Sequence, residues 1–472
     1  MRLFEALVKH GGQPAILDAN GASISHRDLV EISDAGVNGI GTRQLVFCLC
    51  SNSVSSIIGY VGLVRQDHVC VMLPSNIDLS RLKPLVELFQ PNYIFAPTEV
   101  LGAFELNVSQ KVFDYGFAQI SKEPVVMHPD LSLLMTTSGS TGSPMLVRIS
   151  HSNSLSNAVS IIESLSLKST DRALTTLPMN YTYGLSIINS QLQIGGSLVV
   201  SDATIMDREF WTLVRESGAT YFGGVPYTYQ MLQRLGLKKL AGSNLRMLTQ
   251  AGGKLDEESV MRIHSECASL GIEFNVMYGQ TEATARISVL KSDLVPKHPW
   301  SIGHAIPGGK LRVVNTESGM EVSQGVIGEL EYSGPNVAMG YAASCADLSR
   351  EADLGGTLRT GDLAVLEEDG FLRIVGRRNR FVKIFGNRVN LDDVEEMVTC
   401  TGFQAACTGI DDKITVHVIH SGDFDSALLQ NSVAKFIGAH KNSIEIKKIS
   451  KIPRSESGKV LYSVLMGGSN DN

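Results

Sequence analysis

The stretch "VFCLCSNSVSSIIGYVGLVRQDHVCVML" (residues 46–73) decides the fold class. Two short apolar runs, "VFCLC" (46–50) and "VCVML" (69–73), flank a longer segment (51–68) with the apolar spacing of a helix. Strands that are apolar on both faces and are joined by helices are typical of a parallel sheet covered on both sides. The stretch therefore predicts a strand–helix–strand unit of an α/β protein.

The same alternation of apolar strands and amphipathic helices continues to "IEFNVMY" (272–278). From about residue 300 the pattern changes to short strands with Gly and Pro turns, which predicts a smaller β-rich unit. After "GRRNR" (376–380), roughly ninety residues alternate between short strands and two helices. This tail is long enough to form a separate α+β domain.

Bulk composition narrows the class of protein. The chain has 472 residues, 43% of them hydrophobic and 19% charged, with a net charge of −7. A nucleic-acid-binding surface normally requires a basic domain, and no segment approaches the ~18 apolar residues of a membrane span. The seven cysteines form no CxxC pair and indicate small core residues in a reducing compartment. We expect a cytoplasmic enzyme with no nucleic-acid partner and no integral membrane segment.

One loop suggests a ligand. Seven consecutive Thr, Ser and Gly residues (136–142) follow an apolar run, "LLM" (133–135). Such a loop is either a flexible linker or a phosphate cradle, in which small residues let backbone N–H groups crowd an anion. It is not a Walker P-loop, because no Lys follows Gly142.

Three further motifs follow in order: "YGQTEA" (278–283), "RTGDL" (359–363) and "PRSESGK" (453–459). Each alone is typical of an ordinary turn or solvated loop. The first comes after an apolar strand, where α/β sheets bind ligands. The order and spacing of all four elements favour the phosphate cradle over the linker.

Taken together, these motifs resemble the adenylate-forming superfamily, which includes acyl-CoA synthetases, nonribosomal-peptide adenylation domains and luciferases. The matching stretches also include "GELEYSGPNVAMGY" (328–341) and "GRRNRFVKIFGNRVNLDDVE" (376–395), so the resemblance covers nearly the whole chain. It implies a large N-terminal domain (1–376) with two parallel-sheet α/β subdomains and a small β-rich unit at about 300–376. A hinge (377–379) and a small mobile α+β domain (380–472) would follow.

The resemblance implies activation of a carboxylic acid by ATP and Mg²⁺ to acyl-AMP, with release of pyrophosphate, and then transfer to a thiol. Lys459 and Thr281 would be catalytic, and Glu282 would be both catalytic and the Mg²⁺ ligand, a hard oxygen donor suited to that ion. Asp362 would accept hydrogen bonds from the ribose, with Arg377 as a second anchor. The remaining residues that the resemblance assigns to ATP are Thr137, Ser138, Gly139, Ser140, Thr141, Gly142, Ala251, Gly252, Gly253, Tyr278 and Gly279.

For the thiol step, the resemblance implies that the small domain rotates at Asn379 and presents Gly386 and Arg388. Three positions depart from the family pattern. Met145 replaces a common loop Lys, so we expect weaker pyrophosphate binding. Asn379 stands where Asp or Lys is usual. Tyr181 stands where a His is common, and it either shapes the acid pocket or belongs to the core.

The acid pocket is expected around Tyr181, Gly223, Gly224 and Val225. The segments "GGVPYTY" (223–229) and "TQAGG" (249–253) are apolar and aromatic without an obvious charge, which favours an uncharged acyl or aryl acid, as in fatty-acid or aryl-acid metabolism, over an α-amino acid. The acceptor is either CoA or the phosphopantetheine of a separate carrier protein. A non-catalytic ATP-binding protein is an alternative of another class; retention of Glu282, Asp362 and Lys459 disfavours it. A luciferase-type oxygenase is a further alternative.

Overall fold

Strand β3 (Leu45–Cys50), helix α2 (Val54–Arg65) and strand β4 (Val69–Pro74) form the predicted strand–helix–strand unit, and β3 pairs with β4 in parallel. All six residues of β3 and five of β4 are buried. The computed structural model describes residues 2–136, 145–385, 387–410, 412–420, 422, 424–454 and 460–467. The described residues fall into two compact units.

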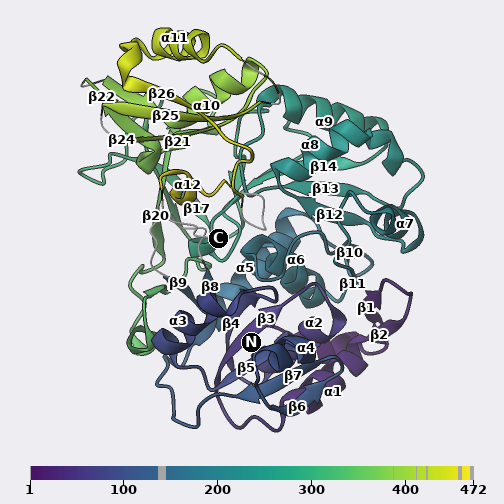
Figure 1. The fold of residues 1–472 in the computed structure, drawn as a ribbon. Helices are drawn as coiled ribbons and strands as arrows, with labels where there is room; N and C mark the ends of the chain where they lie inside the picture. The colour runs from purple at the N-terminus through teal and green to yellow at the C-terminus, as the bar shows by residue number, and fades with distance from the viewer. Residues whose placement is uncertain are drawn as a thin grey trace. The chain divides into compact units, whose positions relative to one another are not determined.

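The first unit comprises residues 2–136, 145–311 and 332–358 and contains two sheets (Figure 1). Parallel pairing links β4 with β8, β3 with β4, and β3 with β5. The spatial order of the eight-stranded sheet is β19 (Gly340–Ala342), β9 (Leu146–Ser150), β8 (Leu131–Thr136), β4, β3, β5 (Tyr93–Pro97), β7 (Tyr115–Gln119) and β6 (Val108–Val112).

The second sheet of this unit has nine strands, and its central strands from β1 to β14 are parallel. Antiparallel strands close it at both edges. Its spatial order is β16 (His304–Ala305), β15 (Ser288–Leu290), β14 (Glu273–Tyr278), β13 (Met247–Gln250), β12 (Tyr221–Gly224), β10 (Arg172–Leu174), β11 (Ser197–Val200), β1 (Pro14–Asp18) and β2 (Ser23–Ser25).

Helices α2, α5 (His151–Ser164) and α6 (Thr182–Gln193) lie between the two sheets and contribute to a core that both sheets share (Figure 1). Ser150 caps the start of α5 and Ser53 caps α2, because a Ser hydroxyl accepts a free N–H of the first turn. The remaining helices of this unit are α1 (His26–Val37), α3 (Leu79–Phe89), α4 (Thr98–Ala103), α7 (Arg208–Glu216), α8 (Pro226–Leu235) and α9 (Glu257–Ser269), with 3-10 helices η1 (Glu5–His10), η2 (Leu237–Leu240), η3 (Thr281–Ala283) and η4 (Cys345–Ser349).

The second unit comprises the described residues of 312–331 and 359–472. Its core packs α10 (Leu391–Cys400) and α11 (Ser426–Ile437) with a three-stranded sheet. Its elements are β17 (Lys310–Val314), β18 (Gly328–Ser333), β20 (Thr357–Leu366) and β21 (Leu372–Arg377) in one sheet, β22 (Phe381–Ile384) with β23 (Asn387–Asn390), β24 (Gln404–Ile410) with β25 (Lys413–Ile419) and β26 (Ile444–Lys448), the short helix α12 (Tyr462–Leu465), and the 3-10 helices η5 (Arg378–Arg380) and η6 (Lys441–Ser443).

The prediction of an α/β fold with parallel sheets is confirmed, and the predicted tail elements appear as β24, β25, β26, α10 and α11. The chain passes between the two units within β17, β18 and β20. The predicted domain boundaries at 376 and 380 stay a prediction. In the ranges given above, no helix combines the length and the apolarity that crossing a membrane requires.

Candidate active site

Three neighbouring parallel strands of the nine-stranded sheet end at one edge. The register places Gly224 of β12 opposite Gln250 of β13, and Gln250 opposite Val276 of β14. The sequence-predicted segments 223–225, 251–253 and 278–282 therefore lie at, or directly after, the ends of strands that end side by side. In open α/β sheets, ligands bind outside the carboxyl ends of the strands. The fold thus brings the predicted acid-pocket, adenine and metal segments together.

Close packing explains two of the glycines at this edge. A Cβ at Gly279 would overlap the carbonyl oxygen of Ala285, because the chain reverses between β14 and β15. Gly252 has φ +85°, and a Cβ there would lie 2.6 Å from the Tyr181 hydroxyl. Both positions therefore require glycine.

Glu282 lies in η3, directly after β14, and its carboxylate is held from the other sheet of the same unit. The Tyr341 hydroxyl, on β19, donates to Glu282 Oε1 at 2.9 Å. Burial first, and then the charge of Glu282, raise the pKa of Tyr341, so this hydroxyl stays a donor. The Glu282 carbonyl accepts from Ala338 N at 2.8 Å. Glu282 is thus held by two hydrogen bonds, one to its carboxylate and one to its backbone carbonyl.

The N-terminus of α6 approaches the same place. Thr182 Oγ1 and Thr281 Oγ1 are 2.9 Å apart and share a hydrogen bond. The Tyr183 hydroxyl lies 2.7 Å from Thr249 Oγ1 and donates to the Thr249 carbonyl at 2.9 Å. Tyr181 is half-buried and its ring meets that of Tyr183 edge-on at 6.3 Å between centroids. The two tyrosines therefore lie between α6 and the carboxyl end of β13.

The turn between η3 and β15 has a strained backbone. Thr284 has φ +54° and Ala285 has φ +108°, although neither is glycine. The amide of Asn336 donates to the Arg286 carbonyl at 2.8 Å and to the Ala283 carbonyl at 2.7 Å. This brace holds the turn, because backbone strain of this kind persists only where the surroundings impose it.

Asp362 and Arg377 belong to the second unit, where they lie opposite each other on β20 and β21. Arg377 Nε donates to Asp362 Oδ1 at 2.9 Å, and Asp362 is 3% exposed. The preceding residues of β20 are anchored on β18, because Gly361 N donates to Glu329 and Thr360 Oγ1 donates to the Leu330 carbonyl. Gly361 has φ +73°, which explains the glycine of the "RTGDL" motif.

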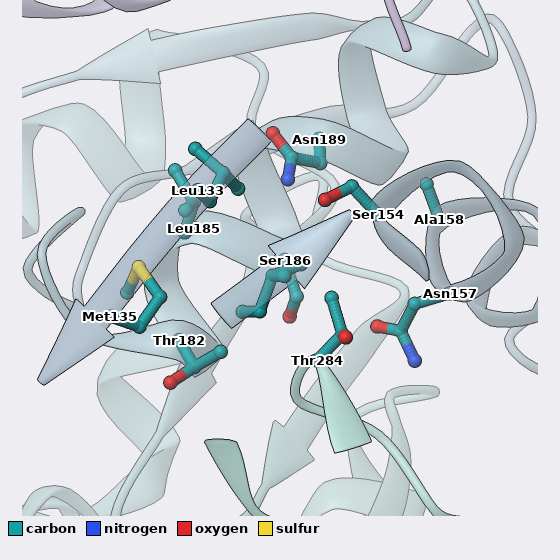
Figure 2. Close-up of a pocket in the computed structure, with 11 residues that line it drawn as sticks. Leu133, Met135, Ser154, Asn157, Ala158, Thr182, Leu185, Ser186, Asn189 and Thr284 are labelled. Carbon is teal, nitrogen blue, oxygen red and sulfur yellow. The ribbon is translucent and has the colours of Figure 1, made fainter. Parts of the chain in front are cut away.

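A small cavity lies beside this site in the first unit (Figure 2). It is bounded by β8, β9, α5 and α6 and by Thr284, and Thr182 and Ser154 both face it (Figure 2). The centre of a water molecule can occupy about 10 Å³ of this cavity, which is room for about one water. Ser154 Oγ is buried there without a hydrogen-bond partner among the described residues. The cavity suits a structural water and is too small for a substrate.

Several predicted residues lie outside the described residues: Thr137, Ser138, Gly139, Ser140, Thr141, Gly142, Gly386 and Lys459. The strands on either side of 137–144, β8 and β9, pair antiparallel. Asn379 lies in η5 and Arg388 lies in β23. Their roles, and those of all the predicted site residues, stay predictions.

Three residues at this site were not predicted from sequence: Tyr183, Tyr341 and Arg286. Arg286 is 2% exposed, and its guanidinium lies 4.7 Å from the centroid of the Tyr183 ring. The expectation of a pocket without charge considered only 223–229 and 249–253, and Arg286 lies in neither segment. The available signal was a lone basic residue in "ATARISVL" (283–290), directly after the Tyr-Gly-x-Thr-Glu motif.

Comparison with known proteins supports the resemblance. Over 442 residues the chain is 27% identical to a 2-succinylbenzoate–CoA ligase of Bacillus cereus (strain AH820), covering 90% of this chain and 88% of that one. It is 26% identical over 349 residues to a medium-chain fatty-acid–CoA ligase of Escherichia coli (strain K12), covering 71% and 61% respectively.

The structure superposes on O-succinylbenzoate Coenzyme A synthetase (MenE) from Bacillus subtilis, in complex with ATP and magnesium ion, with a TM-score of 0.76. That alignment covers 98% of both chains at 17% identity. Residues 3–342, more than two thirds of the chain, match the family model described as AMP-binding enzyme. The resemblance inferred from the motifs is therefore confirmed, and the chain belongs to the AMP-binding enzyme family.

Proposed function

We propose that this protein activates a carboxylic acid with ATP, forming acyl-AMP and pyrophosphate, and then transfers the acyl group to a thiol. One observation carries the proposal. The Glu282 carboxylate is oriented by Tyr341 at the edge where β12, β13 and β14 end, next to the residues that the family assigns to adenine and acid. The named activities of the relatives, which are CoA ligases, agree with it.

The residues present fit a magnesium ion that is bound mainly through substrate. Within the described residues, no three His, Cys, Asp or Glu side chains cluster closely enough to hold a metal ion. Mg²⁺ in ATP sites is held by one or two carboxylates together with substrate phosphates, so Glu282 alone suffices. The ion would neutralise phosphate charge, and Glu282, whose Oε1 accepts a hydrogen bond from the Tyr341 hydroxyl, would hold it.

The other roles follow from charge and hydrogen bonding. Thr281, whose hydroxyl also bonds Thr182, contacts the α-phosphate. Asp362 accepts hydrogen bonds from the ribose, and Arg377 orients its carboxylate through the 2.9 Å bond. Lys459 bridges the acid carboxylate and the α-phosphate, where negative charge develops in the transition state.

For the thiol step we propose that residues 380–472 act as a separate domain that turns about 377–379, with Asn379 as pivot and with Gly386 and Arg388 presented to the thiol. CoA is the proposed acceptor, since the relatives are named as CoA ligases. We place the enzyme in the cytoplasm, since its seven cysteines include no disulfide and five of them are buried.

The test is a pair of assays on one preparation. Acid-dependent ATP–pyrophosphate exchange measures adenylation without a thiol, and thioester release is then measured with CoA and with a holo-carrier protein. We expect exchange with one class of acid and thioester formation with CoA. Absence of exchange with every fatty, aryl and dicarboxylic acid would contradict the proposed function, and release with the carrier protein alone would contradict CoA as the acceptor.

A further inference from the structure

We propose that Arg286 binds a second carboxylate of the acid substrate, so that this enzyme selects dicarboxylic acids over monocarboxylic acids. This inference rests on the proposed function, because it assigns the substrate class of the same site. Only one carboxylate reacts: its oxygen attacks the α-phosphorus and pyrophosphate leaves. The second carboxylate stays ionised throughout and pairs with Arg286.

Arg286 is a buried cation without a counter-ion among the described residues. Its side chain is 2% exposed, and its Nε has no hydrogen-bond partner among the described residues. Among the described residues, the groups that act on its charge are Tyr183 and Tyr181, with no carboxylate, and the centroid of the Tyr183 ring lies 4.7 Å from the guanidinium. The other residues of this unit, 1, 137 and 144, are Met, Thr and Pro and carry no carboxylate. The described residues of the unit therefore supply no counter-charge to Arg286.

Neither tyrosine supplies the missing negative charge. Burial raises the pKa of both Tyr181 and Tyr183 to about 12, so both hydroxyls stay neutral near pH 7. An arginine remains protonated in a protein interior, because its ordinary pKa exceeds 12. Burial lowers the pKa of Arg286 from its ordinary value.

Arg148 shows how this chain treats a buried arginine that is structural. Arg148 is 0% exposed, and its guanidinium bonds Asp353 Oδ2 at 2.8 Å and the carbonyl of Glu351 at 3.0 Å. A buried charge is ordinarily paired in this way, because an isolated one is strongly disfavoured. Arg286 has the same burial and none of these partners, which indicates that its partner is a ligand.

Arg286 also lies near the proposed acid pocket. It lies over the ring of Tyr183, whose hydroxyl bonds Thr249 at the carboxyl end of β13. A Cβ at Gly223, at the end of β12, would lie 2.7 Å from that same hydroxyl. Gly223 belongs to the proposed acid pocket, so Arg286 adjoins the pocket across a single aromatic ring.

Arg286 directly follows two residues with a strained backbone. Thr284 and Ala285 both have positive φ, and Asn336 clamps the carbonyl groups on either side of them. Strain of this kind is concentrated at ligand sites. Here it sets the direction of the chain immediately before the buried guanidinium.

A planar guanidinium matches a carboxylate through two parallel N–H···O bonds, which favours carboxylate over a single-point acceptor. Tyr181, which stands where the family commonly has His, is half-buried and lies beside both Tyr183 and Gly252. It therefore belongs to the surroundings of the proposed carboxylate site.

The experiment compares matched acids that differ in one carboxylate: hexanoate with adipate, octanoate with suberate, and benzoate with phthalate. Binding is measured by calorimetry, with and without a non-hydrolysable ATP analogue, and exchange is measured in parallel. A charge-assisted bidentate pair is worth roughly ten- to a hundredfold in affinity. We expect the wild type to prefer at least one diacid by this factor, and Arg286→Met to lose the preference.

Arg286→Lys retains the charge without the planar fork and should keep part of the preference. Arg148→Met is the matched control: it removes an equally buried arginine and should leave the preference unchanged while lowering the melting temperature. Arg286→Met should fold, because a linear apolar side chain replaces an unpaired buried charge.

The outcomes separate the two proposals. Equal or weaker binding of every diacid relative to its monoacid, or a preference that survives in Arg286→Met, overturns the assignment of Arg286. Pyrophosphate exchange with monocarboxylic acids alone agrees with the proposed function and contradicts a dicarboxylic acid as the substrate. If a dicarboxylic acid binds in a way that depends on Arg286 but supports no pyrophosphate exchange, the result supports the carboxylate site at Arg286 and contradicts the adenylation activity.

Discussion

Replacing Tyr341 by Phe tests whether Glu282 is the magnesium ligand. The substitution removes one hydroxyl, which donates to Glu282 Oε1 at 2.9 Å, and leaves the ring in place on β19. A hydrogen bond to a charged group contributes about 1.5–3 kcal/mol, which corresponds to roughly ten- to a hundredfold in an equilibrium constant. Loss of a residue that orients a metal ligand typically reduces metal affinity by a similar factor.

We therefore expect the Mg²⁺ concentration for half-maximal pyrophosphate exchange to rise roughly ten- to a hundredfold in Tyr341→Phe. The maximal rate should recover at high Mg²⁺, because the carboxylate itself remains. ATP binding by calorimetry should lose much of its Mg²⁺-dependent increment, while binding without Mg²⁺ stays unchanged. This second readout does not depend on turnover.

Tyr60→Phe is the matched control. It removes a buried hydroxyl that donates to an uncharged acceptor, Asn189 Oδ1, at 3.0 Å. It should lower the free energy of unfolding by about 1 kcal/mol and leave the Mg²⁺ dependence as in the wild type. An unchanged Mg²⁺ dependence in Tyr341→Phe, with Glu282→Gln also active at ordinary Mg²⁺, would refute the assignment of Glu282.

Three further predictions concern other residues. Lys459→Ala should abolish exchange and leave ATP affinity within about threefold, because it acts on charge that develops in the transition state; exchange at the wild-type rate would refute its role. Asp362→Ala should raise the KM for ATP roughly ten- to a hundredfold, through loss of the ribose bonds and of the partner of Arg377; an unchanged KM counts against it. Burial lowers the pKa of His68 to about 4, and its neutral Nδ1 accepts from Gln44 N, so the unfolded chain binds the proton more readily. About 3 kcal/mol of stability should therefore be present above pH 6.5 and lost as pH falls toward 4, and urea unfolding of His68→Asn should show a flatter profile over that window.

The fold was predictable because its signals are local. The apolar runs of β3, β4, β13 and β14 are continuous in sequence, and each is followed by a helix or a turn motif. The convergence of 251–253 and 278–282 was also predictable, since parallel neighbouring strands end at one edge of the sheet.

Contacts between distant segments were not predictable. Tyr341 reaches Glu282 from a short edge strand of the other sheet, 59 residues later in the chain. Arg286 reaches Tyr183 across 103 positions (286 minus 183) and across a turn with two positive φ angles at residues that rarely adopt them. No propensity or spacing rule encodes either contact, because packing imposes both.

The two buried arginines show why Arg286 is a functional rather than a structural feature. For Arg148, the bonds to Asp353 and to backbone carbonyls offset the cost of removing a charge from water. For Arg286, the interaction with the Tyr183 ring contributes up to about 2 kcal/mol, against an effective desolvation cost of several kcal/mol. The ligand-free protein therefore carries an unfavourable charge that a bound carboxylate would relieve. Binding sites accept such losses of stability, whereas a core position with no ligand gains nothing from one. The diacid thus accounts for both the burial of Arg286 and its lack of a partner.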